Sequence, residues 1–146
     1  MSASNTESIK KQKIKLDFKD SKYATGRRKT SIAKVWLKKG SGKIYVNGKL
    51  FSEYFADETH KMQITRPFEI INQATDYDVR CSVKGGGPTG QAGAMVHGIS
   101  KALVMFDKNL KSTLKAEKLT TRDSRALEIK KPGRKKARRS FQFSKR

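Results

Sequence analysis

The sequence contains a single cysteine, Cys81, among its 146 residues. This excludes an internal disulfide and a structural zinc site built on paired cysteines, and it fits a reducing compartment. No apolar run approaches the roughly eighteen residues that a membrane span needs. Residues 1–20 also lack the apolar stretch of a secretory signal peptide, and they are not rich in the arginine typical of organelle transit peptides.

Acidic residues are scarce as well. Thirteen Asp and Glu stand against 34 Lys and Arg, which gives a formal net charge of +21. Residues 1–20 hold five basic and three acidic side chains, residues 21–129 hold twenty and ten, and residues 130–146 hold nine and none. Self-repulsion of this size is tolerable when an anionic partner neutralises it, so the charge predicts a nucleic-acid binder.

Composition divides the chain into three parts. Residues 1–21 are polar and aperiodic, which predicts a flexible N-terminal extension, and residues 22–129 predict one globular nucleic-acid-binding domain. Residues 130–146 form a basic C-terminal tail that contains two phenylalanines. We expect this tail to be disordered in isolation, since it cannot bury enough apolar surface to offset the entropy of ordering. Its cations suit phosphates and its rings suit bases.

Periodicity predicts an α+β domain. Apolar and polar residues alternate over residues 33–38, 43–46 and 78–84, which predicts strands. Cys81 falls on the apolar face of the third strand, so we expect it in the core and not as a nucleophile. The interval 50–74 predicts short helices.

The helical predictions have three further details. The short helices of the interval 50–74 are expected to be interrupted near Pro67, because an interior proline breaks a helix. Apolar residues at helical spacing predict a helix over about 91–106. Asp107 is expected to cap a second helix that runs to about Leu119. From Thr120 onward we expect a loop and then the tail.

A glycine loop, Gly85 to Gly90, lies between the third predicted strand and the helix that follows it. Its sequence fits G-x-G-x-x-G, but no further βα unit follows to complete a dinucleotide site, and Pro88 lacks an N–H for a pyrophosphate. Two interpretations remain open. The glycines make only a tight strand-to-helix connection, or they let an RNA phosphate approach the helix start near Gln91.

No catalytic constellation is evident in the sequence. His60 and His97 are far apart, and we expect surface or RNA-facing positions for both. The pairs Asp57-Glu58 and Asp76/Asp78 are explained by a helix start and a strand entry. We therefore predict a protein that is not an enzyme, with no cofactor, no metal, no small-molecule substrate and no membrane partner. The alternatives are a general nucleic-acid condenser, from charge alone, and a nucleotide-using enzyme built on the glycine loop.

A second basic segment, Thr25 to Ser31, places three consecutive cations before the first predicted strand, with hydroxyl groups on both sides. Such side chains hold phosphates and donate to phosphate or sugar oxygens. Clustering of charge favours binding over an ordinary solvated loop.

Three segments together resemble one family. They are GRRKTSIAKV (26–35), KGGGPTGQAGAMVHGISKAL (84–103) and ARRSFQFSKR (137–146), and their order and spacing are similar to those of the bacterial-type small-subunit ribosomal protein number nine family. The resemblance covers about Tyr23 to the C-terminus, and residues 1–22 look like an extension to which nothing carries over.

The resemblance implies an α+β body with a mixed sheet of about four strands and helices packed on it. It implies binding to 16S-type rRNA in the head of the small subunit, among neighbouring head proteins, and a cytoplasmic, ribosome-bound location. It further implies that the tail runs along rRNA to the P site, where its last residues touch the bound tRNA. Pro132, Lys136 and Phe141 depart from the residues common in the family's tail.

Charge, the glycine loop and the resemblance together give two sets of candidate binding residues. The rRNA-binding candidates are Arg27, Arg28, Lys29, Gly85, Gly86, Gly87, Gln91, Arg134, Lys135, Lys136, Arg138, Arg139 and Phe141. The tRNA-binding candidates, which the resemblance alone implies, are Ser144, Lys145 and Arg146.

Overall fold

Alternation of buried and exposed residues makes the strands of one mixed sheet. The computed structural model describes residues 21–73, 76–126, 129–140 and 142. The strands of this part are β1 (Lys22–Arg28), β2 (Ser31–Lys39), β3 (Ile44–Val46), β4 (Lys49–Leu50) and β5 (Tyr77–Lys84). Their order is β1-β2-β5-β3-β4, with β3 and β5 parallel and the other pairs antiparallel. The predicted α+β class with a mixed sheet is confirmed, and the sheet has five strands where about four were expected.

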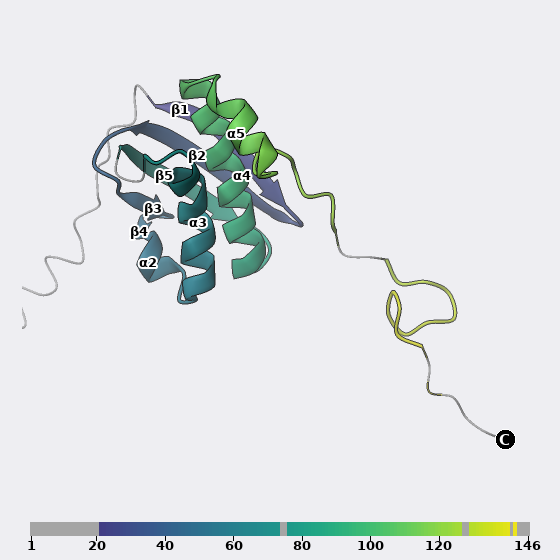
Figure 1. Cartoon of the computed structure of the whole chain (residues 1–146). Helices are drawn as coiled ribbons and strands as arrows, with labels where there is room; N and C mark the ends of the chain where they lie inside the picture. Colours follow the sequence, from purple (N-terminus) through teal and green to yellow (C-terminus); the bar gives the residue numbers. More distant parts are fainter. Residues whose placement is uncertain (1–20, 74–75, 127–128, 141, 143–146) are drawn as a thin grey trace, which may run out of the picture.

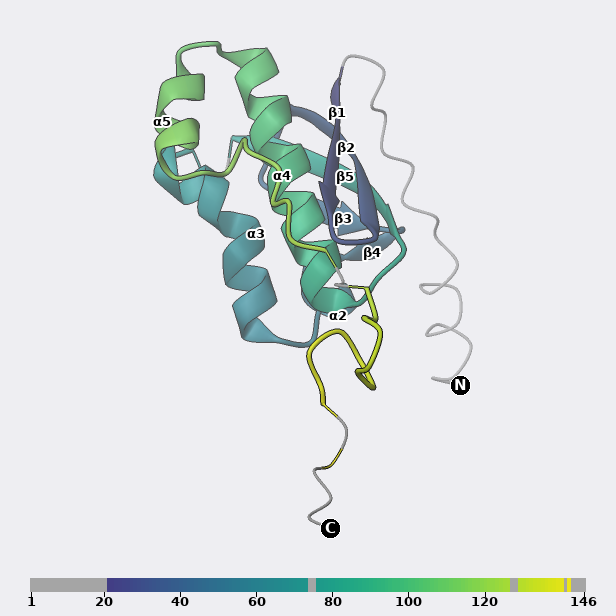
Figure 2. The same ribbon diagram turned by 90° about the vertical axis from the view of Figure 1, so that its right-hand side faces the viewer.

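Helices cover one face of this sheet. They are α2 (Phe51–Tyr54), α3 (Glu58–Ile70), α4 (Pro88–Phe106) and α5 (Leu110–Ala116). Figures 1 and 2 show α3, α4 and α5 on the same side of the sheet, with α4 lying across its middle. Apolar side chains from the inner face of the sheet and from these helices form the core, which includes Cys81 as predicted. Within the described ranges, no helix is long and apolar enough to span a bilayer.

The first strand lies very close to α4. A Cβ built on Gly26 would fall 1.8 Å from the backbone oxygen of Ala94 and 2.4 Å from the backbone nitrogen of Gly98. Only glycine therefore allows this approach of a strand to a helix backbone. The contact fixes the basic segment that follows Gly26 against the N-terminal half of α4.

Two boundaries differ from those predicted. The basic segment does not precede the first strand, because Arg27 and Arg28 are the last residues of β1. Helical structure in the interval 50–74 is interrupted between Tyr54 and Glu58, and not near Pro67, which lies inside α3. Pro67 is buried, so packing of its ring in the core offsets the hydrogen bond that a proline cannot donate.

The remaining helix ends are set by local caps. Helix α4 starts at Pro88, three residues before the expected Gln91, because proline suits a first helical turn. The predicted helix from Asp107 to Leu119 is shorter, Leu110–Ala116. The Asp107 carboxylate accepts the N–H of Asn109 at 2.9 Å, so it stabilises the turn ahead of α5. Asp57 caps α3 by accepting the N–H of Thr59 at 2.9 Å, as the helix-start interpretation requires.

Candidate nucleic-acid interface

The basic segment and the glycine loop lie against each other. Strands β1 and β2 are joined by a two-residue turn, since Arg28 pairs with Ser31. The Ser31 hydroxyl donates to the carbonyl oxygen of Gly85 at 2.9 Å, and the backbone of Thr30 also packs on Gly85. Two segments more than fifty residues apart, both predicted to bind RNA, therefore form one end of the body.

Two glycines of the loop, Gly86 and Gly87, have different roles. Gly86 has φ +62°, and a Cβ there would lie 2.2 Å from the Ser31 hydroxyl oxygen, so this position requires glycine for the turn itself. Gly87 caps α4 with φ −103°, and a Cβ there would meet nothing within 4 Å. The tight connection thus explains Gly86 but leaves Gly87 open to approach from outside.

The start of α4 has few free N–H groups. Pro88 has none, and the N–H of Gln91 donates to the carbonyl oxygen of Gly87 at 2.9 Å. Gly90 is buried, so the N–H left to meet an anion in this first turn is that of the exposed Thr89. The Gln91 side chain is engaged within the protein, because its amide donates to the Gly85 carbonyl at 3.2 Å and accepts the Tyr54 hydroxyl at 2.8 Å.

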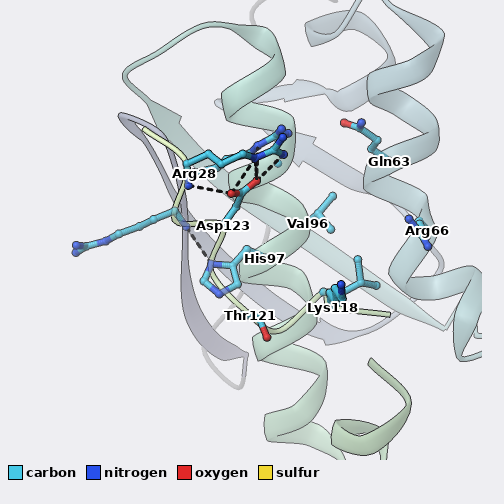
Figure 3. Close-up of a pocket in the computed structure, with 12 residues that line it drawn as sticks. Arg28, Gln63, Arg66, Val96, His97, Lys118, Thr121 and Asp123 are labelled. Carbon is cyan, nitrogen blue, oxygen red and sulfur yellow. Dashed lines mark hydrogen bonds and ion pairs between the residues drawn. The ribbon is translucent and has the colours of Figure 1, made fainter. Parts of the chain in front are cut away.

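A basic hollow of about 290 Å³ lies beside this end of the body (Figure 3). Strand β1, helices α3 and α4, and the segment after α5 together form its wall. Cationic residues predominate among the charged residues that line it, with Asp123 as the acid. The cations are Arg27, Arg28, Arg66, Lys118 and Arg125.

The three cations of the basic segment diverge. The side chain of Arg28 turns toward the hollow, with its Cδ lying 2.1 Å from where a Cβ on Gly93 would be, and only 21% of it is exposed. Lys29 is exposed at the turn and has a left-handed backbone, with φ +53°. Arg27 borders the hollow, but it follows Gly26, which faces α4, so its exposed side chain leaves the opposite face of β1. The three cations of the segment therefore do not form one cluster, because their side chains leave the end of β1 in different directions.

His97 joins β1 to the segment that leads into the tail. Its Nδ1 accepts the backbone N–H of Arg27 at 3.2 Å, so the hydrogen lies on Nε2, which donates to the carbonyl oxygen of Thr120 at 3.2 Å. Burial, followed by the charge of Lys101, lowers the pKa of His97 below its ordinary value. The expected surface or RNA-facing position holds only in part, since His97 lines the basic hollow but is half-buried and uses both ring nitrogens inside the protein. His60 is also partly buried, with Nε2 lying 3.2 Å from the Thr89 hydroxyl oxygen.

Asp123 ties the same segment to the body. Its carboxylate accepts three hydrogen bonds from the Arg125 side chain, at 2.7 to 3.1 Å, and lies 3.9 Å from Nε of Arg28. The hydrogen bonds from Arg125 hold the pKa of Asp123 well below its usual range, and the charge of Arg28 acts in the same direction. Sequence reasoning did not include His97 or Asp123 among the binding residues, because neither lies in a local motif and their contacts with Arg27 and Arg28 of β1 span about seventy or more positions.

The described part of the tail folds back on itself. Gly133 adopts φ +76°, Arg134 and Ser140 form an antiparallel bridge, and the N–H of Lys135 donates to the Arg139 carbonyl at 2.8 Å. The Arg134 guanidinium donates to the Arg138 carbonyl at 3.1 Å and to the Ser140 hydroxyl at 2.6 Å. Figure 1 shows this loop beyond the body.

The tail candidates thus divide into two groups. One group lies in the loop and is exposed: Lys135, Lys136, Arg138 and Arg139. Phe141 and the tRNA-binding candidates Ser144, Lys145 and Arg146 lie outside the described residues.

Cys81 and the acids supply no reactive site in the described part of the chain. Burial raises the pKa of the Cys81 thiol far above its ordinary value, which disfavours the thiolate and confirms the predicted core role. Among the described residues, no group of three His, Cys, Asp or Glu could hold a metal ion. The Asp78 carboxylate is engaged by the N–H groups of Ser41, Gly42 and Lys43 at 3.0 to 3.1 Å.

Comparison with known protein families adds the assignment. The family model described as ribosomal protein S9/S16 matches residues 26–146, from the glycine of β1 through the glycine loop to the end of the tail. That span includes every segment that forms the basic end of the body, and it covers most of the chain. The protein belongs to the ribosomal protein S9/S16 family and is a ribosomal protein of the small subunit.

Proposed function

We propose that this ribosomal protein binds 16S-type rRNA in the head of the small subunit and that its tail reaches the P-site tRNA. The family is a structural, non-enzymatic class. One observation carries the rRNA proposal: the β1–β2 turn, the glycine loop and the segment leading to the tail converge at one basic end of the body. Such a surface suits a phosphate backbone, because lysine and arginine neutralise phosphates and release bound counterions.

The body would position the RNA. Lys29 and Arg28 supply cations from one side, and the N–H group of the exposed Thr89 supplies a hydrogen-bond donor from the other. Contacts of this kind carry little sequence information, so recognition rests on RNA shape and on the fixed arrangement of these groups. Neighbouring head proteins would share the same rRNA, and no membrane or small-molecule partner is invoked.

The tail would extend the reach of the body. We treat residues 1–21 as an extension, 22–129 as the RNA-binding domain and 130–146 as the tail. Fully extended at about 3.3–3.6 Å per residue, seventeen residues span nearly 60 Å. Its cations, Arg138 and Arg139 among them, would lie along rRNA. Lys145 and Arg146 would neutralise phosphates of the tRNA bound in the P site, and Ser144 would contact the same tRNA.

Reconstitution of the small subunit tests both parts. Subunits assembled with the full-length protein are compared with subunits that carry a protein lacking residues 144–146, and the affinity for P-site tRNA is measured. We expect both proteins to sediment with the subunit at high salt, and the truncated protein to lower tRNA affinity. Unchanged tRNA affinity would refute the tail proposal. Release of the full-length protein at moderate salt would refute specific rRNA binding and favour a general nucleic-acid condenser.

A further inference from the structure

One residue from each of the five strands lies in a single row across the sheet. The register pairs Tyr23 with Trp36, Trp36 with Arg80, and Tyr45 with both Arg80 and Leu50. In β2 and β5 the neighbours of Trp36 and Arg80 along the chain are buried among the core residues, so this row lies on the other face. Figure 2 shows α3, α4 and α5 on the core side of the sheet, which leaves the face with the row free of these helices.

The exposed end of the row is built from aromatic rings held by their neighbours. The rings of Tyr23 and Trp36 have centroids 5.2 Å apart at an interplanar angle of 48°, and the Arg80 guanidinium carbon lies 5.3 Å from the centroid of the Trp36 ring. The Thr25 hydroxyl donates to the Tyr23 oxygen at 3.1 Å. Tyr23 is still 43% exposed. These contacts fix ring positions before any ligand arrives, which lowers the entropy lost on binding.

Cations surround this row on the same face. The register places Lys34 beside Thr25 and Ser82, and the next row contains Arg27, Ile32 and Lys84. On the other side Lys38 pairs with Asp78, whose carboxylate is already engaged by the backbone of residues 41–43. The strands thus place five cations and one acid on this face. The cations are Arg27, Lys34, Lys38, Arg80 and Lys84.

We propose that this face of the sheet, opposite α3, α4 and α5, binds an unpaired segment of small-subunit rRNA, with bases stacked at Tyr23 and Trp36 and phosphates near Lys34 and Lys84. The inference rests on the proposed function and adds a second binding surface to it. An exposed aromatic row offers flat faces to bases, and the cations around it select a polyanion. The segment is unpaired because bases inside a duplex present no free face to a protein ring. A protein partner would need several acids to match the same charge.

Crosslinking in assembled subunits tests the proposal. Small subunits reconstituted with the full-length protein are irradiated with ultraviolet light, which joins nucleobases to aromatic side chains in direct contact, and the products are mapped by mass spectrometry. We expect RNA adducts on peptides containing Tyr23 or Trp36. Crosslinks of these peptides to another protein, or no RNA adduct in subunits that contain the protein, would overturn this inference alone. Failure of the protein to join the subunit would instead refute the proposed function.

Paired variants distinguish the contributions of the aromatic ring and of the cation to rRNA binding from an effect on folding. Tyr23→Ala removes the ring and Tyr23→Phe keeps it, while Arg80→Gln and Lys108→Gln each remove one cation, the second from the exposed turn before α5. We expect Tyr23→Ala to weaken binding of the protein to rRNA on the order of tenfold, as loss of one base–aromatic stack does, and Tyr23→Phe to leave it unchanged. Arg80→Gln is expected to weaken binding more than Lys108→Gln. Equal affinities within each pair, with folding checked by circular dichroism, would overturn the inference.

The fluorescence of Trp36 also measures RNA binding at this face directly, because Trp36 is the only tryptophan of the chain. Titration of the full-length protein with a short single-stranded polyadenylate oligonucleotide should quench its fluorescence. Binding seen by oligonucleotide anisotropy without any change in Trp36 emission would place the RNA elsewhere and count against this face.

Discussion

The body and the tail carry similar net charge but hold it differently. Residues 21–129 have twenty basic and ten acidic side chains, whereas residues 130–146 have nine basic and none acidic. In the body, some cations are held by acids, as in Arg66–Glu117 at 2.9 Å and Arg125–Asp123 at 2.7 Å. In the described tail, Arg134 bonds to a carbonyl and a hydroxyl of its own loop. The body therefore fixes where its cations point, and the tail keeps cations that can be redirected.

Removal of residues 130–146 should have the largest effect on binding. Each phosphate neutralised contributes about −0.9 to the slope of log affinity against log salt on a duplex, so loss of nine cations should make that slope much shallower. Thermal unfolding of the body should be unchanged, since the core residues all precede the tail. Binding isotherms to small-subunit rRNA at several salt concentrations measure the first effect, and calorimetry measures the second. A lower melting temperature would show that the two regions are not independent.

Substitutions in the glycine loop should separate folding from binding within the body. Gly86→Ala should destabilise the protein by about 1–3 kcal/mol, because alanine is disfavoured at φ +62° and its Cβ meets the Ser31 hydroxyl. Gly87→Ala should leave stability nearly unchanged but weaken rRNA binding if a phosphate approaches that backbone. Urea unfolding and rRNA affinity are measured for both. Full affinity in Gly87→Ala would support a loop that is only a connection.

Changes at Lys29 should move stability and binding in opposite directions. Lys29→Gly should stabilise the body by roughly 0.5–1 kcal/mol, because the residue has φ +53° and glycine tolerates this conformation better. It should nevertheless weaken rRNA binding, because a fixed cation is lost. Lys29→Gln is the matched control that removes the charge while the backbone remains strained. If both variants bind rRNA as the wild type does, the turn is not part of the interface.

The smallest expected effect is a dependence of the body's free energy of unfolding on pH, which comes from His97. Its folded pKa lies below the ordinary value of 6.5, so the unfolded chain binds the proton more readily. The free energy of unfolding should therefore fall as pH drops through and below about 6.5, when protonation removes the acceptor for the Arg27 N–H. His97→Gln should flatten this dependence. It should not change the effect that removal of residues 130–146 has on the salt dependence of rRNA affinity. Unfolding curves at pH values on both sides of that pKa measure it, and an unchanged slope in the variant would assign the dependence elsewhere.

Periodicity predicted the elements that have a strong buried face. In β5, Val79, Cys81 and Val83 alternate with polar residues, and helix α4 carries a continuous apolar stripe, so both were predicted from the sequence. Strand β1 was missed because its buried positions are Ala24 and Gly26, which are too small to give an apolar signal. These residues are small because α4 packs closely against β1. The sequence of β1 alone does not show that a helix lies there.

The candidate site was predictable only in its parts. Arg28, Lys29 and the glycine loop stand out by charge or by glycine content, but nothing local indicates that Ser31 joins them through Gly85. The roles of His97 and Asp123 depend on partners across the fold, so no window of sequence contains them. The direction in which each cation points follows from strand register, which the sequence alone did not fix because β1 itself was unrecognised.

The loop at residues 134–140 has a consequence for the length of the tail. Seven residues that would span roughly 20 Å when extended begin and end at adjacent positions, since Arg134 pairs with Ser140. The tail is therefore shorter while the Arg134 guanidinium bonds to Arg138 and Ser140, and it would lengthen if that guanidinium exchanged those acceptors for a phosphate. Opening of the loop would let the tail extend further, and RNA phosphates would favour this extended form by replacing the hydrogen bonds inside the loop.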